Sequence, residues 1–265
     1  MPRRAPDHAR DAGGDPEMLA AKTALRDEVW AAIQAAGAAR FPGAYGRIPN
    51  FIGAERAAER LRATSEWGRA ATIKANPDAP QWPVRQRALE DGKTVFMAVP
   101  RLADANPFFL LDPARLTTSA RKASSIRGAS VHAVKVAVEA LEAVDRVVAG
   151  SVAVDAHGAR LGKGGGFSDL EFAIATGLGL IGSTTRIATT VHETQVVAVG
   201  RIPVTPHDVR VDLIVTPDRV IRCRHGRRRA AAIRWADLTE DKIGTIPVLA
   251  GLRRAAHQLV TPGTA

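Results

Sequence analysis

Apolar side chains recur at helical spacing near the start of the chain. Between residues 16 and 36 they fall on one face of a helix. Asp15 stands at the N-cap position, and Gly37 follows where helices commonly end. A second helix is predicted over residues 54–62, and the proline- and glycine-rich stretch 41–51 between the two predicts a loop.

Short apolar segments then alternate with helical ones, a pattern typical of a parallel sheet covered by helices. The near-continuous apolar run 146–154 indicates a strand buried on both faces. The other predicted strands lie at 70–74, 94–99, 187–191 and 211–215, and the other helices at 84–90, 168–176 and, as a pair around Ile246-Pro247, 238–257. The expected fold is a three-layer α/β/α arrangement with a mostly parallel sheet.

Composition agrees with one globular α/β domain. The chain has 265 residues, 46% of them apolar and 24% charged. The N-terminus lacks the apolar core of a secretory signal, and no apolar run approaches the roughly 18 residues of a membrane span. Cys223 is the only cysteine, which excludes an internal disulfide. We expect a cytoplasmic protein with no membrane partner. Its expected parts are a disordered tail, the domain and a C-terminal tail, at residues 1–16, 17–258 and 259–265.

The net charge of +10 is concentrated in residues 219–234, which carry arginines and no acidic residue. Such a run is most often a solvated loop. It can also bind nucleic acid through phosphate contacts or attract small polyanions. Nucleic acid is the less favoured of these partners, because the chain has few aromatic residues and no RNA-recognition motif.

The most informative segment is a glycine cluster at residues 162–166, which reads Gly-Lys-Gly-Gly-Gly. It stands between a predicted strand and a predicted helix. Glycines let the backbone approach an anion, the helix N-terminus offers unpaired N–H groups, and Lys163 adds a positive charge. The spacing fits neither a Walker A loop nor a dinucleotide-binding loop. The cluster therefore predicts a phosphate cradle of another type, with a flexible linker or helix cap as the alternative.

Residues 160–169 read Arg-Leu-Gly-Lys-Gly-Gly-Gly-Phe-Ser-Asp and resemble the R-x-G-x-G-x-G-Y-Y-D motif of the 5-formyltetrahydrofolate cyclo-ligases, also called methenyltetrahydrofolate synthetases. Residues 21–26, 92–101 and 202–212 resemble other segments of this family in the same order. Residues 152–154, 169–172 and 216–221 resemble its subfamily of methenyltetrahydrofolate synthase domain-containing proteins.

The resemblance implies a reaction in which ATP converts the reduced folate 5-formyltetrahydrofolate to 5,10-methenyltetrahydrofolate, with release of ADP and phosphate. Lys163 and Arg160 would be the catalytic cations. The ATP contacts that the resemblance implies are Lys22, Arg26, Arg101, Arg160, Leu161, Gly162, Lys163, Gly164, Gly165, Gly166, Phe167 and Ser168.

The resemblance also implies a Mg²⁺ cofactor, held by Asp169 and Asp208, since this ion prefers carboxylate oxygens. The implied folate contacts are Asp78, Gly164, Gly166 and Phe167. Without the resemblance, simpler interpretations stand beside these roles. Lys22 and Arg26, which share a helix face, can be solvated surface charges. Asp169 can favour a helix dipole, and Asp208 can cap a turn.

Two departures from the family pattern keep other functions open. Phe167 and Ser168 replace the family's two tyrosines, and residues 102–144 differ strongly where the folate side of the site should lie. The alternatives are a non-catalytic binder of nucleotide or folate on the same fold, and an RNA-binding protein that uses residues 219–234. No heptad pattern is present, so the sequence leaves the oligomeric state open.

Overall fold

The structure is a computed structural model that describes residues 15–99, 102, 104–164, 167–205, 208–225, 233 and 235–260. For residues 167–169, 237, 242 and 255–260 it describes the backbone and not the side chains.

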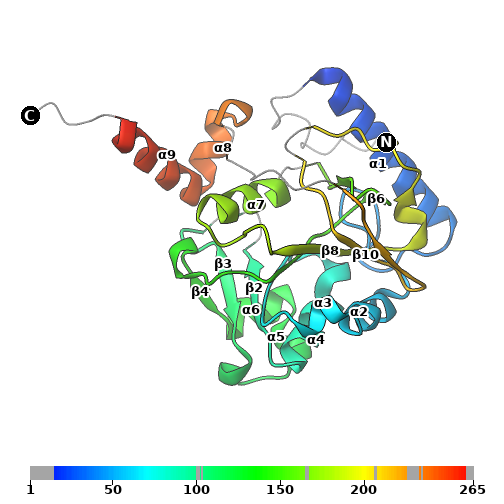
Figure 1. The fold of residues 1–265 in the computed structure, drawn as a ribbon, viewed down its shortest axis with the longest axis horizontal. Helices are drawn as coiled ribbons and strands as arrows, with labels where there is room; N and C mark the ends of the chain where they lie inside the picture. Colours follow the sequence, from blue (N-terminus) through cyan, green and yellow to red (C-terminus); the bar gives the residue numbers. More distant parts are fainter. Residues whose placement is uncertain are drawn as a thin grey trace, which may run out of the picture.

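A large sheet forms the centre of the fold, with the strand order β11-β10-β8-β5-β1-β2-β3-β4 (Figure 1). The strands from β10 to β2 run parallel to one another, whereas β11, β3 and β4 pair antiparallel at the edges. The predicted, mostly parallel sheet is thus confirmed. Its strands are β1 (Thr72–Ala75), β2 (Thr94–Ala98), β3 (Phe108–Leu111), β4 (Val134–Val136), β5 (Arg146–Val148), β8 (Arg186–Thr190), β10 (Leu213–Val215) and β11 (Val220–Arg222).

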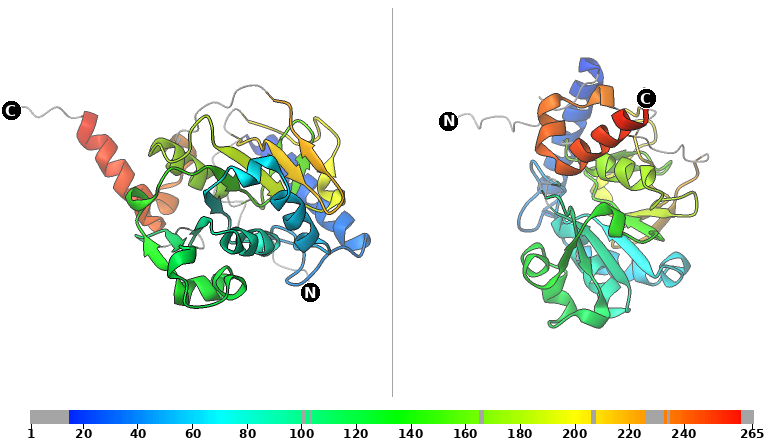
Figure 2. Two further views of the ribbon diagram at one scale, coloured as in Figure 1. Left: turned by 60° about the horizontal axis from the view of Figure 1, so that its bottom comes forward. Right: turned by 90° about the vertical axis from the view of Figure 1, so that its left-hand side faces the viewer.

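Helices cover both faces of this sheet, which confirms the three layers. Helices α2 to α6 lie on one face, and α7 to α9 lie on the other (Figures 1 and 2). The α-helices are α1 (Pro16–Ala35), α2 (Ala54–Arg62), α3 (Ser65–Gly68), α4 (Trp82–Glu90), α5 (Ala120–Ala123), α6 (Ile126–His132), α7 (Phe167–Gly177), α8 (Glu240–Thr245) and α9 (Pro247–Val260). The 3₁₀ helices are η2 (Ala79–Gln81), η4 (Pro113–Arg115), η5 (Val138–Ala140), η6 (Glu193–Gln195) and η7 (Trp235–Asp237).

The central strands supply two separate hydrophobic cores because neighbouring side chains of a strand point to opposite faces. In β5, Val148 packs in the core that includes Leu61 of α2 and Val84 of α4. Its neighbour Val147 packs in the core that includes Ile174 of α7. Burial on both faces explains why both of these neighbouring positions are apolar.

A second, small sheet carries the first helix. It consists of β6 (Ala153–Asp155), β7 (Arg160–Leu161) and β9 (Val196–Val197), in the order β7-β6-β9. The apolar face of α1 packs against this sheet rather than the large one (Figure 1). The side chain of Asp15 caps α1 by accepting a hydrogen bond from the Glu17 amide at 3.1 Å, as the sequence predicts.

The sequence predicts one strand within residues 146–154, and the structure has two. The structure divides it into β5 of the large sheet and β6 of the small one. At the break, a side chain on Gly150 would lie 2.9 Å from both Asp78 Oδ2 and Ile48 Cγ1, so close packing demands glycine there. Ser151 bonds through its hydroxyl to Thr189 at 2.9 Å rather than continuing the strand. Apolar character alone carries no signal for this change of sheet.

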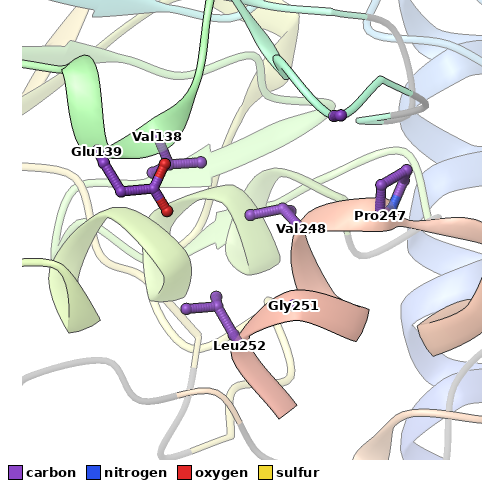
Figure 3. Close-up of a pocket in the computed structure, with 7 residues that line it drawn as sticks. Val138, Glu139, Pro247, Val248, Gly251 and Leu252 are labelled. Carbon is purple, nitrogen blue, oxygen red and sulfur yellow. The ribbon is translucent and has the colours of Figure 1, made fainter. Parts of the chain in front are cut away.

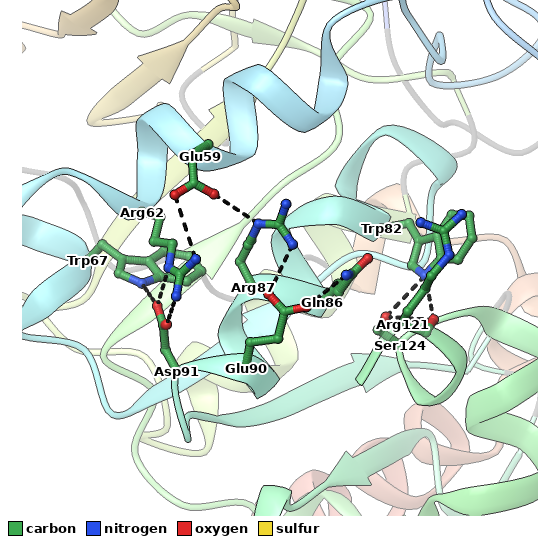
Figure 4. Close-up of polar contacts among 10 residues, drawn as sticks. All are labelled: Glu59, Arg62, Trp67, Trp82, Gln86, Arg87, Glu90, Asp91, Arg121 and Ser124. Carbon is green, nitrogen blue, oxygen red and sulfur yellow. Dashed lines mark hydrogen bonds and ion pairs between the residues drawn. The ribbon is translucent and has the colours of Figure 1, made fainter. Parts of the chain in front are cut away.

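Charged side chains connect α2 and α4 at their outer surface (Figure 4). Arg62 of α2 donates to Asp91, which also accepts from the indole of buried Trp67 at 2.7 Å. Arg87 of α4 donates to Glu59 at 2.9 Å. These contacts join the two helices and the turn after α4, so this face is explained by the fold itself. Among the described helices, none combines the length and apolarity that a bilayer span requires.

Candidate functional site

The candidate site lies where the parallel strands end. Chain segments that follow the carboxyl ends of parallel strands meet at one edge of a sheet, the usual position of ligands in α/β folds. Residues 76–78 follow β1, and Gly150 follows β5. The glycine loop, residues 162–166, follows β7 and precedes α7, so the predicted strand, loop and helix order is present. Of this loop the structure describes residues 162–164.

Lys22 reaches from α1 to the segment before β10. Its Nζ lies 2.7 Å from Asp208 Oδ2, and the two side chains are 13% and 21% exposed. The same oxygen accepts a hydrogen bond from the Thr205 amide at 2.7 Å, so Asp208 also closes a turn. Two residues that the resemblance assigns to phosphate and metal are therefore direct neighbours, although 186 positions separate them in the sequence.

Arg26, one helical turn after Lys22, connects α1 to the glycine loop. Its Nε donates to the Gly162 carbonyl at 2.8 Å. A side chain added at Gly164 would lie 3.5 Å from Arg26 Cζ, and Gly164 has a φ of 110°, which favours glycine. Burial lowers the pKa of Arg26, while Asp27 and Asp208 oppose the shift. The guanidinium remains charged at neutral pH.

Lys163 of the glycine loop pairs with Asp78, in the segment that follows β1. Its Nζ lies 3.1 Å from Asp78 Oδ1, and Lys163 is 44% exposed whereas Asp78 is 13% exposed. The resemblance assigns these residues to phosphate and to folate, and the structure brings them into contact. Either partner can exchange this contact for a ligand, because Lys163 is largely open to solvent.

Arg160 is buried at 6% exposure and donates from Nη1 to the Gly150 carbonyl at 2.9 Å. The turn before it is fixed by Asp155, whose Oδ1 accepts from the amides of His157 and Ala159. Burial of Arg160 places positive charge beneath the loop, where a low dielectric strengthens its effect on an anion.

A buried arginine that the sequence analysis missed supports the end of β1. Arg85 of α4 is 1% exposed and donates to the carbonyls of Asn76 at 2.5 Å and Asp78 at 3.2 Å. Burial lowers its pKa to about 10, and Asp78 opposes the shift. The only sequence signal for this role is its position among Val84, Ala88 and Leu89 on the buried side of the helix.

Apart from Leu161, the remaining site residues lie wholly or partly outside the described structure. Arg101, Gly165 and Gly166 are outside the described residues, and for Phe167, Ser168 and Asp169 only the helical backbone is described. Leu161 is buried in the core beneath α1. Among the described residues no group of three or more acidic, histidine or cysteine side chains gathers around a metal position. Mg²⁺ does not need such a cage, because it binds through one or two carboxylates together with substrate phosphates and water.

A pocket of about 310 Å³ lies between the loop before β3, the helix η5 and the start of α9 (Figure 3). Figure 3 shows Val248 and Leu252 of α9 facing Val138 and Glu139 of η5. Apart from Glu139 its lining is apolar: Ala105, Val138, Pro247, Val248, Gly251 and Leu252.

Part of the arginine-rich segment is engaged within the fold. Arg219 pairs with Glu193 at 2.8 Å, and Arg222 pairs with Glu66 at 2.9 Å. These pairs attach the edge of the large sheet to η6 and α3. The arginines at 227–229 and 234 lie outside the described residues.

The chain is similar in sequence to known proteins. Residues 17–217 match the 5-formyltetrahydrofolate cyclo-ligase family. Relatives described as methenyltetrahydrofolate synthase domain-containing protein are 36% identical in Bos taurus, with 92% of this chain and 65% of the relative covered, and 37% identical in Mus musculus, with 89% and 64% covered. The chain thus spans slightly less than two thirds of the length of these relatives.

A solved structure shares the fold. The NMR structure of Aquifex aeolicus 5,10-methenyltetrahydrofolate synthetase covers 78% of this chain and 94% of its own, with a TM-score of 0.50 and 22% identity. That identity supports a common fold, and the match over residues 17–217 carries the family assignment. With its three layers, its glycine loop and the cations of α1 beside that loop, the chain belongs to the 5-formyltetrahydrofolate cyclo-ligase family.

Proposed function

We propose that the protein uses Mg²⁺-ATP to convert 5-formyltetrahydrofolate to 5,10-methenyltetrahydrofolate, releasing ADP and phosphate. The observation that carries the proposal is the meeting of α1 with the glycine loop, through Arg26 and Gly162 at 2.8 Å. This hydrogen bond brings Lys22 and Arg26 of α1 to the glycine loop that carries Lys163. The loop lies at the sheet edge where α/β folds bind ligands.

In this proposal the cations hold the triphosphate and stabilise charge as the phosphoryl group moves. Transfer of a phosphoryl group depends mainly on positioning and on neutralising charge that spreads over its oxygens. Lys163, at the surface, would turn from Asp78 to the phosphate, while buried Arg160 keeps a fixed positive charge below the loop. The formyl oxygen would accept the phosphoryl group, the second folate nitrogen would attack the formyl carbon, and phosphate would leave.

Asp208 and Asp169 are the proposed Mg²⁺ ligands. A carboxylate 2.7 Å from Lys22 suits an ion that binds between protein and phosphate, because Lys22 can then take a phosphate oxygen. The ion would neutralise phosphate charge. Asp78, freed from Lys163, would accept hydrogen bonds from the reduced folate, whose ring carries several N–H donors.

The proposal is tested by mixing the protein with Mg²⁺-ATP and 5-formyltetrahydrofolate and following ADP and methenyltetrahydrofolate together. We expect equal amounts of the two products, and a loss of turnover in Lys22→Ala and Asp208→Asn. An exposed lysine of α5 supplies the control Lys122→Ala, which should leave turnover unchanged. Absence of methenyltetrahydrofolate with intact Mg²⁺-ATP binding would replace the proposal by a non-catalytic nucleotide-binding function.

One observation favours the alternative, a non-catalytic nucleotide-binding function. Phe167 and Ser168 stand where the family motif has two tyrosines, so two hydroxyl groups are lost or displaced. One lost neutral hydrogen bond costs about 0.5–1.5 kcal/mol, or about tenfold in rate at most. Such a loss slows an enzyme and does not abolish it. Ser168→Tyr with Phe167→Tyr should therefore raise turnover modestly if the reaction is retained.

A further inference from the structure

Two opposite charges are buried between the middle of the large sheet and the helix that follows the glycine loop. Lys74 of β1 is 3% exposed and Glu171 of α7 is 4% exposed, and they form an ion pair. Lys74 also donates to Asn76 Oδ1 at 3.4 Å. None of these residues belongs to the family motif at residues 160–169. In the described contacts, Lys22 and Arg26 of α1 bind other partners.

The ion pair attaches the start of α7 to the large sheet. Helix α7 begins at Phe167, directly after the loop, and Glu171 lies about one turn into the helix. Its partner stands on β1, which is hydrogen-bonded to β5 on one side and β2 on the other. The first turn of α7 is therefore attached to a rigid central strand.

The segment that follows β1 contacts the described part of the loop. Asp78, four residues after Lys74, holds Lys163 at 3.1 Å. Arg85 stiffens this stretch by binding the carbonyls of Asn76 and Asp78. Residues 74–78 thus contact Lys163 within the loop and Glu171 in the helix that follows it.

Stability alone does not account for such a pair. Removal of two charges from water costs free energy that their attraction recovers only with good geometry, and apolar substitutes are often as stable or more stable. An ion pair does, however, define one position of α7 on the sheet, since an apolar contact would tolerate sliding. We infer that Lys74 and Glu171 are positioning residues that hold the first turn of α7, directly after the glycine loop, ready for phosphate. This inference rests on the proposed function for the nature of that phosphate, an ATP triphosphate.

The test replaces both charges by apolar side chains of similar size, in the variant Lys74→Met with Glu171→Met. Backbone amide exchange of residues 160–175 is followed by mass spectrometry, without nucleotide. We expect exchange in this segment to be faster by about tenfold or more, with the thermal midpoint retained or raised. Mg²⁺-ATP affinity measured by calorimetry should fall by about tenfold or more, because misplaced donors lose much of their effect.

The matched control is Lys135→Met, which removes a lysine that pairs with Asp104 at 2.6 Å on the edge strand β4. It should change neither exchange at residues 160–175 nor Mg²⁺-ATP affinity. Unchanged exchange of the segment in the double variant would overturn the inference, as would acceleration spread evenly over the chain.

A charge-swapped variant covers the case in which the double methionine variant does not fold. Lys74→Glu with Glu171→Lys should protect residues 160–175 better than either single substitution. If the swap protects no better than the singles, the inference is wrong. If wild-type protein binds no Mg²⁺-ATP, the proposed function fails, whereas the exchange results still decide whether the pair positions the loop.

Discussion

Single charged residues of the candidate site are held in pairs across the fold. Lys22 pairs with Asp208, and Lys163 pairs with Asp78, both through contacts between distant segments. Charges held in this way keep fixed positions, and each lysine can exchange its carboxylate for a phosphate oxygen. In the proposed function the pairs would preorganise the site, because they keep its cationic and anionic groups close to one another.

The substitution Lys22→Ala should weaken Mg²⁺-ATP binding by about 10- to 100-fold, because a hydrogen bond to a charged group is worth about 1.5–3 kcal/mol. Calorimetric titration of wild type, Lys22→Ala and the control Lys122→Ala measures the effect. Equal affinity in all three proteins would remove Lys22 from the nucleotide site.

Cys223 is protected from reaction at ordinary pH. Burial raises the pKa of its thiol to about 12 from 9.0, with Asp212 and Asp155 adding to the shift. The thiolate is the reactive form, so its fraction at pH 8 falls by roughly a thousandfold. A thiol reagent should label native protein very slowly and unfolded protein fast. Rapid labelling of the native protein would show that this thiol is not shielded.

The secondary-structure elements differ in how much of their position the sequence carries. Helix α1 follows from its periodicity and its Asp15 cap, whereas α2 has no side-chain cap, and most central strands follow from short apolar runs. The break between β5 and β6 depends on contacts of Gly150 with Ile48 and Asp78, which no local pattern encodes. Strands β7 and β9 span only two residues each, too few for a detectable alternation.

The same distinction applies to the site. Lys22, Arg26 and the glycine loop became candidates because their motifs resemble a known family, and the structure places Arg26 beside Gly162. Arg85 and the Lys74–Glu171 pair did not become candidates, since a buried charge and an exposed one look alike in a sequence. The segment between β2 and β5 also escaped prediction, because its elements, β3, α5, α6 and β4, are short.

The turn between β6 and β7 should tolerate no side chain at Gly158. This residue has a φ of 81°, and an added Cβ would lie 2.3 Å from the Val211 carbonyl oxygen. Gly158→Ala should lower the free energy of unfolding by at least about 2 kcal/mol, from backbone strain plus overpacking.

Gly179→Ala is the matched control, because Gly179 has a φ of 73° and no atom within 4 Å of an added Cβ. Backbone strain alone should cost about 1–2 kcal/mol there. Urea unfolding of both variants measures the difference. If Gly158→Ala cost no more than Gly179→Ala, the close approach of Val211 would be wrong.

Across the whole molecule, ion pairs connect layers that are far apart in the sequence. Arg222 of the edge strand β11 binds Glu66 of α3, 156 positions away in the sequence. Arg56 of α2 pairs with Asp218 of the turn before β11 at 3.0 Å. Contacts of this kind use part of the excess positive charge to join the sheet edge to the helical layer.

Acid should weaken the Glu66 contact. Its hydrogen bond with Arg222 lowers the pKa of Glu66 from 4.5 to about 2. The unfolded chain then binds the proton more readily, so this contribution is complete above about pH 5 and is lost as the pH falls towards 2. Solvent screening limits it to about 1 kcal/mol or less, because Arg222 is 61% exposed.

Arg222→Met should therefore reduce the decline of unfolding free energy between pH 5 and pH 2, as measured by urea titrations. The exposed neighbour Arg224 provides the control Arg224→Met, which should follow wild type. An identical decline in wild type and Arg222→Met would mean that the contact does not persist in solution.

The central claim, that the phosphate of ATP activates the formyl group of a reduced folate, is tested most directly by following the formyl oxygen. 5-Formyltetrahydrofolate labelled with ¹⁸O in that group is incubated with the protein and Mg²⁺-ATP, and the released phosphate is analysed by mass spectrometry. We expect one labelled oxygen in the phosphate for each methenyltetrahydrofolate formed, and neither product with Lys22→Ala. Phosphate without label, or phosphate released without methenyltetrahydrofolate, would contradict the account.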